Sequence, residues 1–189
     1  FGSYELMGRV LRLFKFGGVR ALANPLGEMV AKAIAEQAEG MPDSLLVVPV
    51  PLFGRRRPYN QSDLLAQGAL RAVRREHPEW AMEFAPRCMT RVHHREAHYR
   101  LSPGERRENV RGAFRVTGDV RGRHVLLVDD VYTTGATIAE CTEMLLSAGA
   151  VSVRAVTLAR AGMEMPVLWT PRSPVSASNT SVQESTLRQ

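Results

Sequence analysis

The sequence predicts an α/β fold in which helices flank a central parallel sheet. Three apolar runs, 44–52, 124–130 and 150–160, have the composition of strands that are buried on both faces. Between the second and third runs, apolar residues recur at helical spacing from Ile138 to Ala148. A strand, a helix and a strand in direct succession form a βαβ unit, whose two strands are parallel and whose crossover is right-handed.

The 189-residue length, with 44% hydrophobic residues, suits one domain with one sizeable core. We place this domain at residues 1–165. The remaining segment, 166–189, is rich in serine, threonine and proline, so it buries too little apolar surface to offset its ordering entropy. We therefore predict a disordered tail there.

Helices are expected before and after the first strand. The spacing of Leu6, Val10, Leu13 and Phe14 predicts an N-terminal helix that Gly17-Gly18 would end. A second helix is expected from Pro25, and the two would form a small N-terminal hood. A third begins near Ser62, a plausible N-cap residue.

Charge is concentrated in one segment. The formal net charge is +6, and residues 87–123 hold ten Lys and Arg against four Asp and Glu, while the rest of the chain is balanced. We interpret most of 87–123 as a basic loop region with a short strand at 112–116. No apolar run reaches the ~20 residues of a membrane span. The two cysteines, Cys88 and Cys141, form no readable zinc or disulfide framework, so a cytoplasmic protein is expected.

The candidate site follows the second buried strand. Asp129 and Asp130 fall at the carboxyl end of that strand, where parallel sheets bind ligands. The loop 133–137, Thr-Thr-Gly-Ala-Thr, leads into the next helix, whose N-terminus attracts phosphate. A phosphate repels carboxylates, so the aspartates suit hydroxyl groups or a bridging Mg²⁺. The ligand predicted by these residues is a sugar phosphate.

The stretch 125–137, VLLVDDVYTTGAT, resembles the phosphoribosyl pyrophosphate (PRPP) signature of the type I phosphoribosyltransferases. Three further stretches resemble the ComF/GntX group of that superfamily, which is linked to competence for DNA uptake. They are FKFGG at 14–18, VPVPL with RPYNQ within 48–61, and RRENVRGAF at 106–114. The resemblance covers residues 4 to about 160.

The resemblance implies a type I phosphoribosyltransferase-like fold and a set of site residues. Asp129 and Asp130 would be the catalytic pair and would hold Mg²⁺. PRPP would be bound by Asp129, Asp130, Val131, Tyr132, Thr133, Thr134, Gly135, Ala136 and Thr137, and its pyrophosphate by a loop containing Pro51, Arg55, Arg57, Asn60 and Gln61. Further candidates are Lys15, Arg107 and Asn109.

Several of these features have a plainer interpretation. The arginines at 55–57 are equally typical of a solvated charge run, and Lys15 of a surface lysine. The Walker B acidic pair of an NTPase is disfavoured because the sequence has no GxxxxGK[ST] loop. His93, His94 and His98 suggest zinc only weakly because a fourth ligand is not evident. They fit better a flexible basic loop over an anionic substrate, or a nucleic-acid-facing patch.

Two functions remain open at this stage. The first is transfer of ribose 5-phosphate from PRPP to an unidentified acceptor, with Mg²⁺ and release of pyrophosphate. The second is a non-catalytic PRPP-fold protein that assists DNA uptake by binding single-stranded DNA or competence proteins. The chain departs from the ComF/GntX pattern at Pro58, Arg95 and His98, which affects the transfer more than the PRPP site. The sequence leaves the oligomeric state open.

Overall fold

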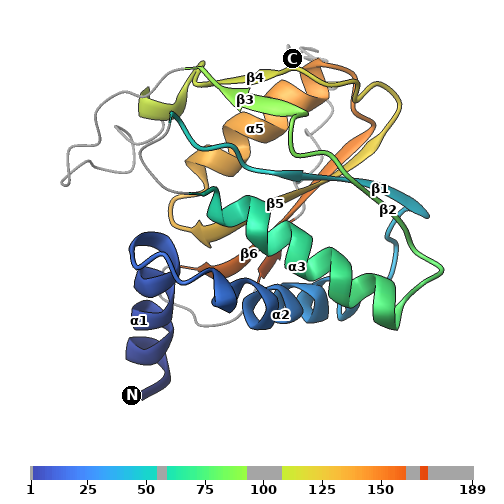
Figure 1. Ribbon diagram of the computed structural model, residues 1–189. Coiled ribbons are helices and arrows are strands. Elements are labelled where there is room, and N and C mark those ends of the chain that lie inside the picture. The colour runs from blue at the N-terminus through green and yellow to red at the C-terminus, as the bar shows by residue number, and fades with distance from the viewer. Residues whose placement is uncertain (1, 55–58, 93–107, 161–166, 170–189) are drawn as a thin grey trace, which may run out of the picture.

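The protein has a five-stranded central sheet between two layers of other elements (Figure 1). The computed structural model describes residues 2–54, 59–92, 108–160 and 167–169. In the sheet order β2-β1-β5-β6-β7, neighbouring strands are parallel except for β7, which is antiparallel to β6. The strands are β1 (Ser44–Pro49), β2 (Ala81–Phe84), β5 (His124–Tyr132), β6 (Ser152–Arg160) and β7 (Val167–Trp169). The predicted parallel α/β fold is confirmed.

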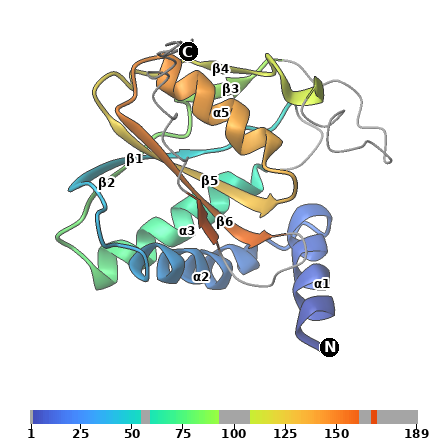
Figure 2. The same cartoon turned by 180° about the vertical axis from the view of Figure 1, so that it is seen from behind.

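Each face of the sheet has its own cover (Figures 1 and 2). One face is covered by α2 (Ala23–Ala35) and α3 (Gln61–Glu76), and the other by α5 (Ala136–Ser147) and a two-stranded antiparallel ribbon of β3 (Met89–Arg91) and β4 (Phe114–Val116). No helix in the described part of the chain is long and apolar enough to cross a bilayer.

Strand β5 lies at the centre of both cores. Val125, Leu126, Leu127 and Val128 are each fully buried. Because successive side chains in a strand point to opposite faces, Leu126 and Val128 pack with α2 and α3, while Val125 and Leu127 pack with α5 and the ribbon. This is the doubly buried strand that the apolar run predicted, and it extends two residues beyond the acidic pair, to Tyr132.

The N-terminal hood contains α1 (Gly2–Phe16) and a 3-10 helix, η1 (Arg20–Leu22), ahead of α2. Helix α1 ends before Gly18, whose φ of 69° is in the left-handed region that favours glycine. Of the four apolar residues that predicted this helix, only Phe14 is fully buried, while Leu6 and Leu13 are exposed.

One predicted cap was wrong by two residues. The N-cap of α3 is Asn60, whose side-chain oxygen accepts a hydrogen bond from the backbone N–H of Ser62 at 3.1 Å. Asn60 has an extended backbone, as a cap requires, and its amide also donates to the carbonyl of Val50 at 3.0 Å. The hydroxyl of Ser62 is thereby left for another partner.

Three short strands were missed. Strand β2 follows a charged stretch, and β3 lies within the segment interpreted as loop, whereas the strand expected at 112–116 is confirmed as β4. Residues 167–169 fall in the predicted tail but form β7 against β6, so the tail prediction was wrong for them. The rest of the predicted tail and residues 93–107 of the predicted basic loop region lie outside the described residues.

Helices α2 and α3 approach each other through two glycines. A Cβ built on Gly27 would lie 2.5 Å from the backbone carbonyl carbon of Gly68. Since backbone atoms of a packed helix cannot move aside cheaply, side chains are excluded at this crossing. The crossing fixes the start of α3, which faces the carboxyl end of β5.

We expect Gly27→Ala to lower the free energy of unfolding by roughly 1–3 kcal/mol, because the new methyl group forces the two helices apart. Gly8 in α1 is the matched control, since a Cβ there would meet nothing within 4 Å. Gly8→Ala should leave stability unchanged or raise it by up to about 1 kcal/mol through helix propensity. Urea unfolding followed by circular dichroism measures both, and equal effects would contradict the close-packing argument.

Candidate ligand site at the carboxyl end of the sheet

The acidic pair lies near the end of β5, on its two sides. Asp129 follows the buried Leu127 in the strand alternation and Asp130 follows Val128, so the two carboxylates point to opposite faces of the sheet. Asp130 faces the side on which the hood lies. Its residue is only 9% exposed, which is unusual for a carboxylate.

Asp129 is held by two hydrogen bonds. Its Oδ1 accepts from the hydroxyl of Ser62 at 2.9 Å and from the backbone N–H of Asp130 at 2.9 Å. Burial, followed by repulsion from Asp130, raises the pKa of Asp129 to about 7, and the two hydrogen bonds and Lys15 oppose that rise. Asp129 therefore exchanges a proton near neutral pH.

Asp130 is paired with a lysine from the hood. The Nζ of Lys15, in the last turn of α1, lies 2.9 Å from Oδ2 of Asp130, and both side chains are largely buried. The ion pair joins the first helix of the chain to the central strand. Lys15 was a candidate on sequence grounds, and the structure brings it to the acidic pair.

The element YNQS, 59–62, holds the end of α1 in place. The hydroxyl of Tyr59 donates to the backbone carbonyl of Phe14, and the amide of Gln61 donates to the carbonyl of Lys15 at 3.2 Å. Gln61 is 1% exposed. These contacts position Lys15, and Asn60 starts α3, while the pyrophosphate role of Asn60 and Gln61 stays a prediction.

The loop after β5 enters α5 through Gly135. Gly135 is the N-cap of α5 and has a φ of 74°, and a side chain there would run into the ring of Tyr132. The hydroxyl of Thr134 accepts from the N–H of Ala136 at 3.5 Å. The guanidinium of Arg160, from the end of β6, lies over the ring of Tyr132, 5.4 Å from its centre. The loop thus presents hydroxyls and free helix N–H groups beside a cation, the elements of an anion site.

The structure brings together most of the predicted residues. The stretch 129–137, Lys15 and the start of α3 meet at one end of the sheet, and Pro51 directly follows β1 beside it. Asn109 is half-buried before β4. Arg55, Arg57 and Arg107 lie outside the described residues, as do Pro58, Arg95 and the histidines 93, 94 and 98.

Two residues near the site were not predicted. Ser62 was interpreted as a cap, and its hydroxyl contacts Asp129 because Asn60 takes the cap position. Arg91, at the end of β3, lies over Phe114 at 5.2 Å, and burial lowers the pKa of its guanidinium while Cys141 and Asp129 act to raise it. Arg91 stood in the sequence only as one of ten cations in a basic segment, which gave no signal of burial.

Comparison with known proteins agrees with this geometry. Residues 73–168 match the family described as the phosphoribosyl transferase domain. The chain belongs to this family. It is 35% identical over 156 residues to the DNA utilization protein YhgH of Escherichia coli O157:H7, an alignment that covers 80% of this chain and 66% of that protein. It is 32% identical to Competence protein F of Haemophilus influenzae over 169 residues, 85% of this chain and 71% of that protein.

These relatives confirm the ComF-type resemblance, and the chain spans about two thirds of the length of the first of them. Among solved structures, glutamine PRPP amidotransferase from B. subtilis aligns with a TM-score of 0.50 at 20% identity, covering 78% of this chain and 30% of that one. At that identity the likeness shows the fold alone. This phosphoribosyltransferase-fold chain thus carries its acidic pair and its threonine-glycine loop at the carboxyl end of the sheet.

Asp129 makes the stability of this fold depend on pH. An unfolded aspartate ionises near 3.8, whereas the folded one stays protonated up to about 7. The unfolded state therefore loses its proton first, and the free energy of unfolding should fall as the pH rises through this window, by about 4 kcal/mol at most for a shift of about three pKa units.

Urea unfolding at a series of pH values should show this decline in the wild type and a flatter curve in Asp129→Asn. Asp119→Asn is the matched control, since Asp119 is an exposed aspartate that accepts only a turn hydrogen bond from Arg121. It should keep the wild-type pH dependence. Parallel curves for the wild type and Asp129→Asn would show that Asp129 ionises normally in the folded protein.

Proposed function

We propose that this protein binds PRPP together with Mg²⁺ and transfers ribose 5-phosphate to an acceptor, releasing pyrophosphate. One observation carries the proposal: a carboxylate pair, with Asp130 buried and Asp129 partly buried, lies just ahead of the left-handed Gly135 that caps α5. Membership of the phosphoribosyl transferase domain family supports the same ligand class.

The two parts of the site suit the two parts of a sugar phosphate. The 5′-phosphate accepts hydrogen bonds from the threonine hydroxyls and the unpaired N–H groups at the start of α5, and the helix dipole favours its charge. The ribose hydroxyls donate hydrogen bonds to Asp129 and Asp130. These carboxylates repel anions, so they suit the sugar and not the phosphate of the ligand. Thr133 is exposed and Thr134 and Thr137 are half-buried, so all three are within reach of solvent.

Lys15 has to adjust when the ligand arrives. Its ammonium already occupies Oδ2 of Asp130, so a ribose hydroxyl competes with it for that carboxylate. PRPP brings several negative charges, and a lysine on a flexible four-carbon chain is able to turn from the carboxylate to the pyrophosphate. We therefore assign Lys15 to the pyrophosphate in the bound state.

The donor set also fits Mg²⁺. Among the described residues, no group of three or more His, Cys, Asp and Glu side chains is arranged to hold a metal. Mg²⁺ commonly binds one or two carboxylates and takes its other ligands from substrate phosphates and water. Asp129 and Asp130 would hold it together with PRPP, and the ion would supply positive charge to offset that of a departing pyrophosphate.

The transfer requires no protein nucleophile. The bond between the anomeric carbon and the pyrophosphate oxygen breaks, the acceptor's lone pair forms the new bond at that carbon, and the acceptor's proton leaves to a base. Positive charge develops at the ring in between, and the two carboxylates beside it stabilise that charge.

A second candidate function is non-catalytic, in DNA uptake. Relatives bear the names DNA utilization protein and Competence protein F. In the basic segment, Arg87, Arg111, Arg115 and Arg121 are exposed. Exposed arginines on neighbouring loops and strands can contact the phosphates of single-stranded DNA.

For the transferase, we expect pyrophosphate release when the protein is incubated with PRPP, Mg²⁺ and a panel of nucleobases and amines. Asp129→Ala should reduce that release by about a hundredfold or more, because a preorganised charge beside the reacting ring is lost. Release is followed with a coupled pyrophosphate assay, and PRPP affinity by calorimetry.

Glu143→Gln is the matched control, an exposed carboxylate on α5 away from the loop, and it should retain full release. PRPP binding without release in every mixture would favour the non-catalytic function. Absence of PRPP binding would contradict both functions at this site.

For the DNA function, we expect binding of single-stranded DNA whose affinity falls steeply with salt, since each phosphate contact releases a counterion. Arg111→Glu with Arg115→Glu should weaken it by at least about tenfold and reduce the salt slope. Arg71→Glu, an exposed α3 arginine that contacts Asn24, is the control and should bind normally. Fluorescence anisotropy at several salt concentrations measures this, and equal losses in both variants would exclude the basic segment as the contact.

A further inference from the structure

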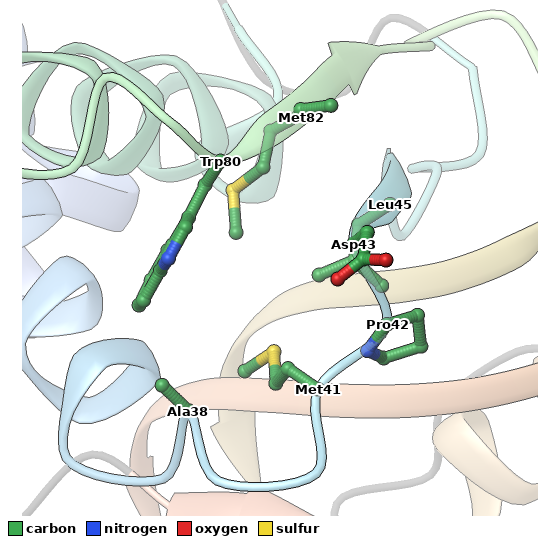
Figure 3. A pocket seen from close by; sticks show the side chains of 8 residues that line it. Ala38, Met41, Pro42, Asp43, Leu45, Trp80 and Met82 are labelled. Atoms are coloured by element: carbon green, nitrogen blue, oxygen red, sulfur yellow. The ribbon is translucent and has the colours of Figure 1, made fainter.

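A small apolar pocket opens at the end of the sheet opposite the acidic pair. Figure 3 shows Trp80 and Met82 on one side of it, and Met41 and Asp43 on the other, with Leu45 behind. Its volume is about 90 Å³. The ring of Trp80 is stacked on His77, with centroids 4.2 Å apart, so one wall of this Trp80 pocket is fixed in place.

The volume of the Trp80 pocket limits the size of the group that it can bind. Pockets for cofactors or drug-sized ligands measure ~300–1,000 Å³, and a water molecule takes ~30 Å³ of liquid. A space of about 90 Å³ therefore holds one aliphatic side chain and nothing larger. The two methionines in its wall adapt readily to the shape of such a side chain. The pocket is suited to a side chain that another polypeptide inserts.

The rim of the pocket is acidic although the protein is basic. The two segments around it, 36–43 and 76–83, carry six Asp and Glu and no Lys or Arg. Three of these carboxylates are paired with cations, Glu36 with Lys32, Glu76 with Arg75 and Glu83 with Arg123. Arg154 also donates to the carbonyl of Gly40 in the first segment. Glu39 and Asp43 are exposed and form no ion pair with the described residues. The surface selects an occupant that is apolar and flanked by cations.

Helix α1 has that composition on its outer side. Leu6 is 62% and Leu13 52% exposed. Between and beside them stand Arg9 and Arg12, both exposed, and residues 6–16 contain no acidic side chain. Leu6, Arg9 and Leu13 are spaced three and four residues apart, which places them along one side of the helix.

These two surfaces cannot meet within one copy of the chain. The end of α1 is bonded to the residues that begin α3, while the pocket follows the end of α3. Helix α3 has 16 residues, about 24 Å at 1.5 Å per residue. Figures 1 and 2 both show α1 projecting from the side of the molecule opposite the start of β2.

We propose that α1 of one copy docks on the Trp80 pocket of a second copy, with Leu13 inserted between Met41, Met82 and Trp80. Arg9 and Arg12 then lie against the acidic rim. The contact is heterologous, since two different surfaces meet, and it leaves one α1 and one pocket free at the two ends of each pair. Copies therefore add head to tail. The proposal is independent of whether the protein transfers ribose 5-phosphate.

The test is sedimentation of the full chain across micromolar to millimolar concentrations. The average mass of the wild type should rise with concentration and fall back as salt is added, because the contact pairs opposite charges. Leu13→Asp, which spoils α1, and Asp43→Lys, which spoils the rim, should each weaken association by at least about tenfold. Leu146→Asp is the matched control, an exposed leucine on α5 that should associate like the wild type.

Mixing the two defective variants gives the decisive result. Leu13→Asp retains a working pocket and Asp43→Lys retains a working α1, so an equimolar mixture should form pairs and nothing larger. In a symmetric contact, by contrast, both copies use the same surface. The mixture would then contain no intact pair of surfaces for a substitution that weakens the contact, and complementation would not occur. Failure of the mixture to form pairs overturns the proposal.

A second measurement reports on the pocket directly. A synthetic peptide with the sequence of residues 2–17 should shift the fluorescence of Trp80 to shorter wavelength in a Trp169→Phe background, since the chain has two tryptophans. The same peptide with serine in place of Leu13 should give no shift. A wild type that remains a single copy at every concentration, with no fluorescence shift from the peptide, overturns the proposal, as does association that Leu146→Asp weakens equally.

Discussion

The burial of β5 on both faces is the constraint on which this structure depends. Four consecutive residues, Val125 to Val128, are inaccessible to solvent, so both faces of the strand require an apolar cover. The cover on one side comes from α2 and α3 and on the other from α5 and the β3–β4 ribbon. A strand enclosed in this way cannot hold charges in its middle, and its carboxylates appear where the cover ends. The ligand site is therefore a direct consequence of the core.

The acidic pair in turn fixes the hood. Helix α1 buries only Phe14 completely, with Val10 and Leu11 partly buried against the same core. Polar contacts complete its attachment: Tyr59 and Gln61 donate to the carbonyls of Phe14 and Lys15, and Lys15 is paired with Asp130. The position of α1 therefore depends in part on hydrogen bonds and on a charge that a ligand would compete for. Elements held in this way open at lower free energy than the core does. The donor side of the site is built on the rigid sheet, and the hood side is the part able to adjust.

The sequence allowed the centre of the fold and of the site to be predicted, because there the local signals agree. The apolar run 124–130, the helical spacing from Ile138 and the run 150–160 each specify one buried element, and together they specify the parallel pair β5 and β6. Strands β2, β3 and β7 have three or four residues each and sit in charged or serine-rich surroundings. Their pairing comes from neighbours that are distant in sequence, which no local pattern reports. The same reason hid Ser62 and Arg91, whose roles depend on contacts with other elements.

Two residues of the predicted pyrophosphate loop also hold the backbone near the site. The amides of Asn60 and Gln61 donate to the carbonyls of Val50 and Lys15, and their contact with a pyrophosphate stays a prediction. A buried carbonyl left without a donor costs on the order of 1–3 kcal/mol, so these side chains satisfy the backbone where the hood, β1 and α3 converge. At this junction, Lys15 supplies a positive charge next to Asp130, where a ligand would bind. The electrostatics of the site thus depend on several cations as well as on the two carboxylates, because Lys15 is paired with Asp130 and Arg91 and Arg160 lie nearby. An incoming anion with ribose hydroxyls meets a site close to neutral overall, which explains how an acidic pair can lie beside a phosphate subsite without repelling its ligand.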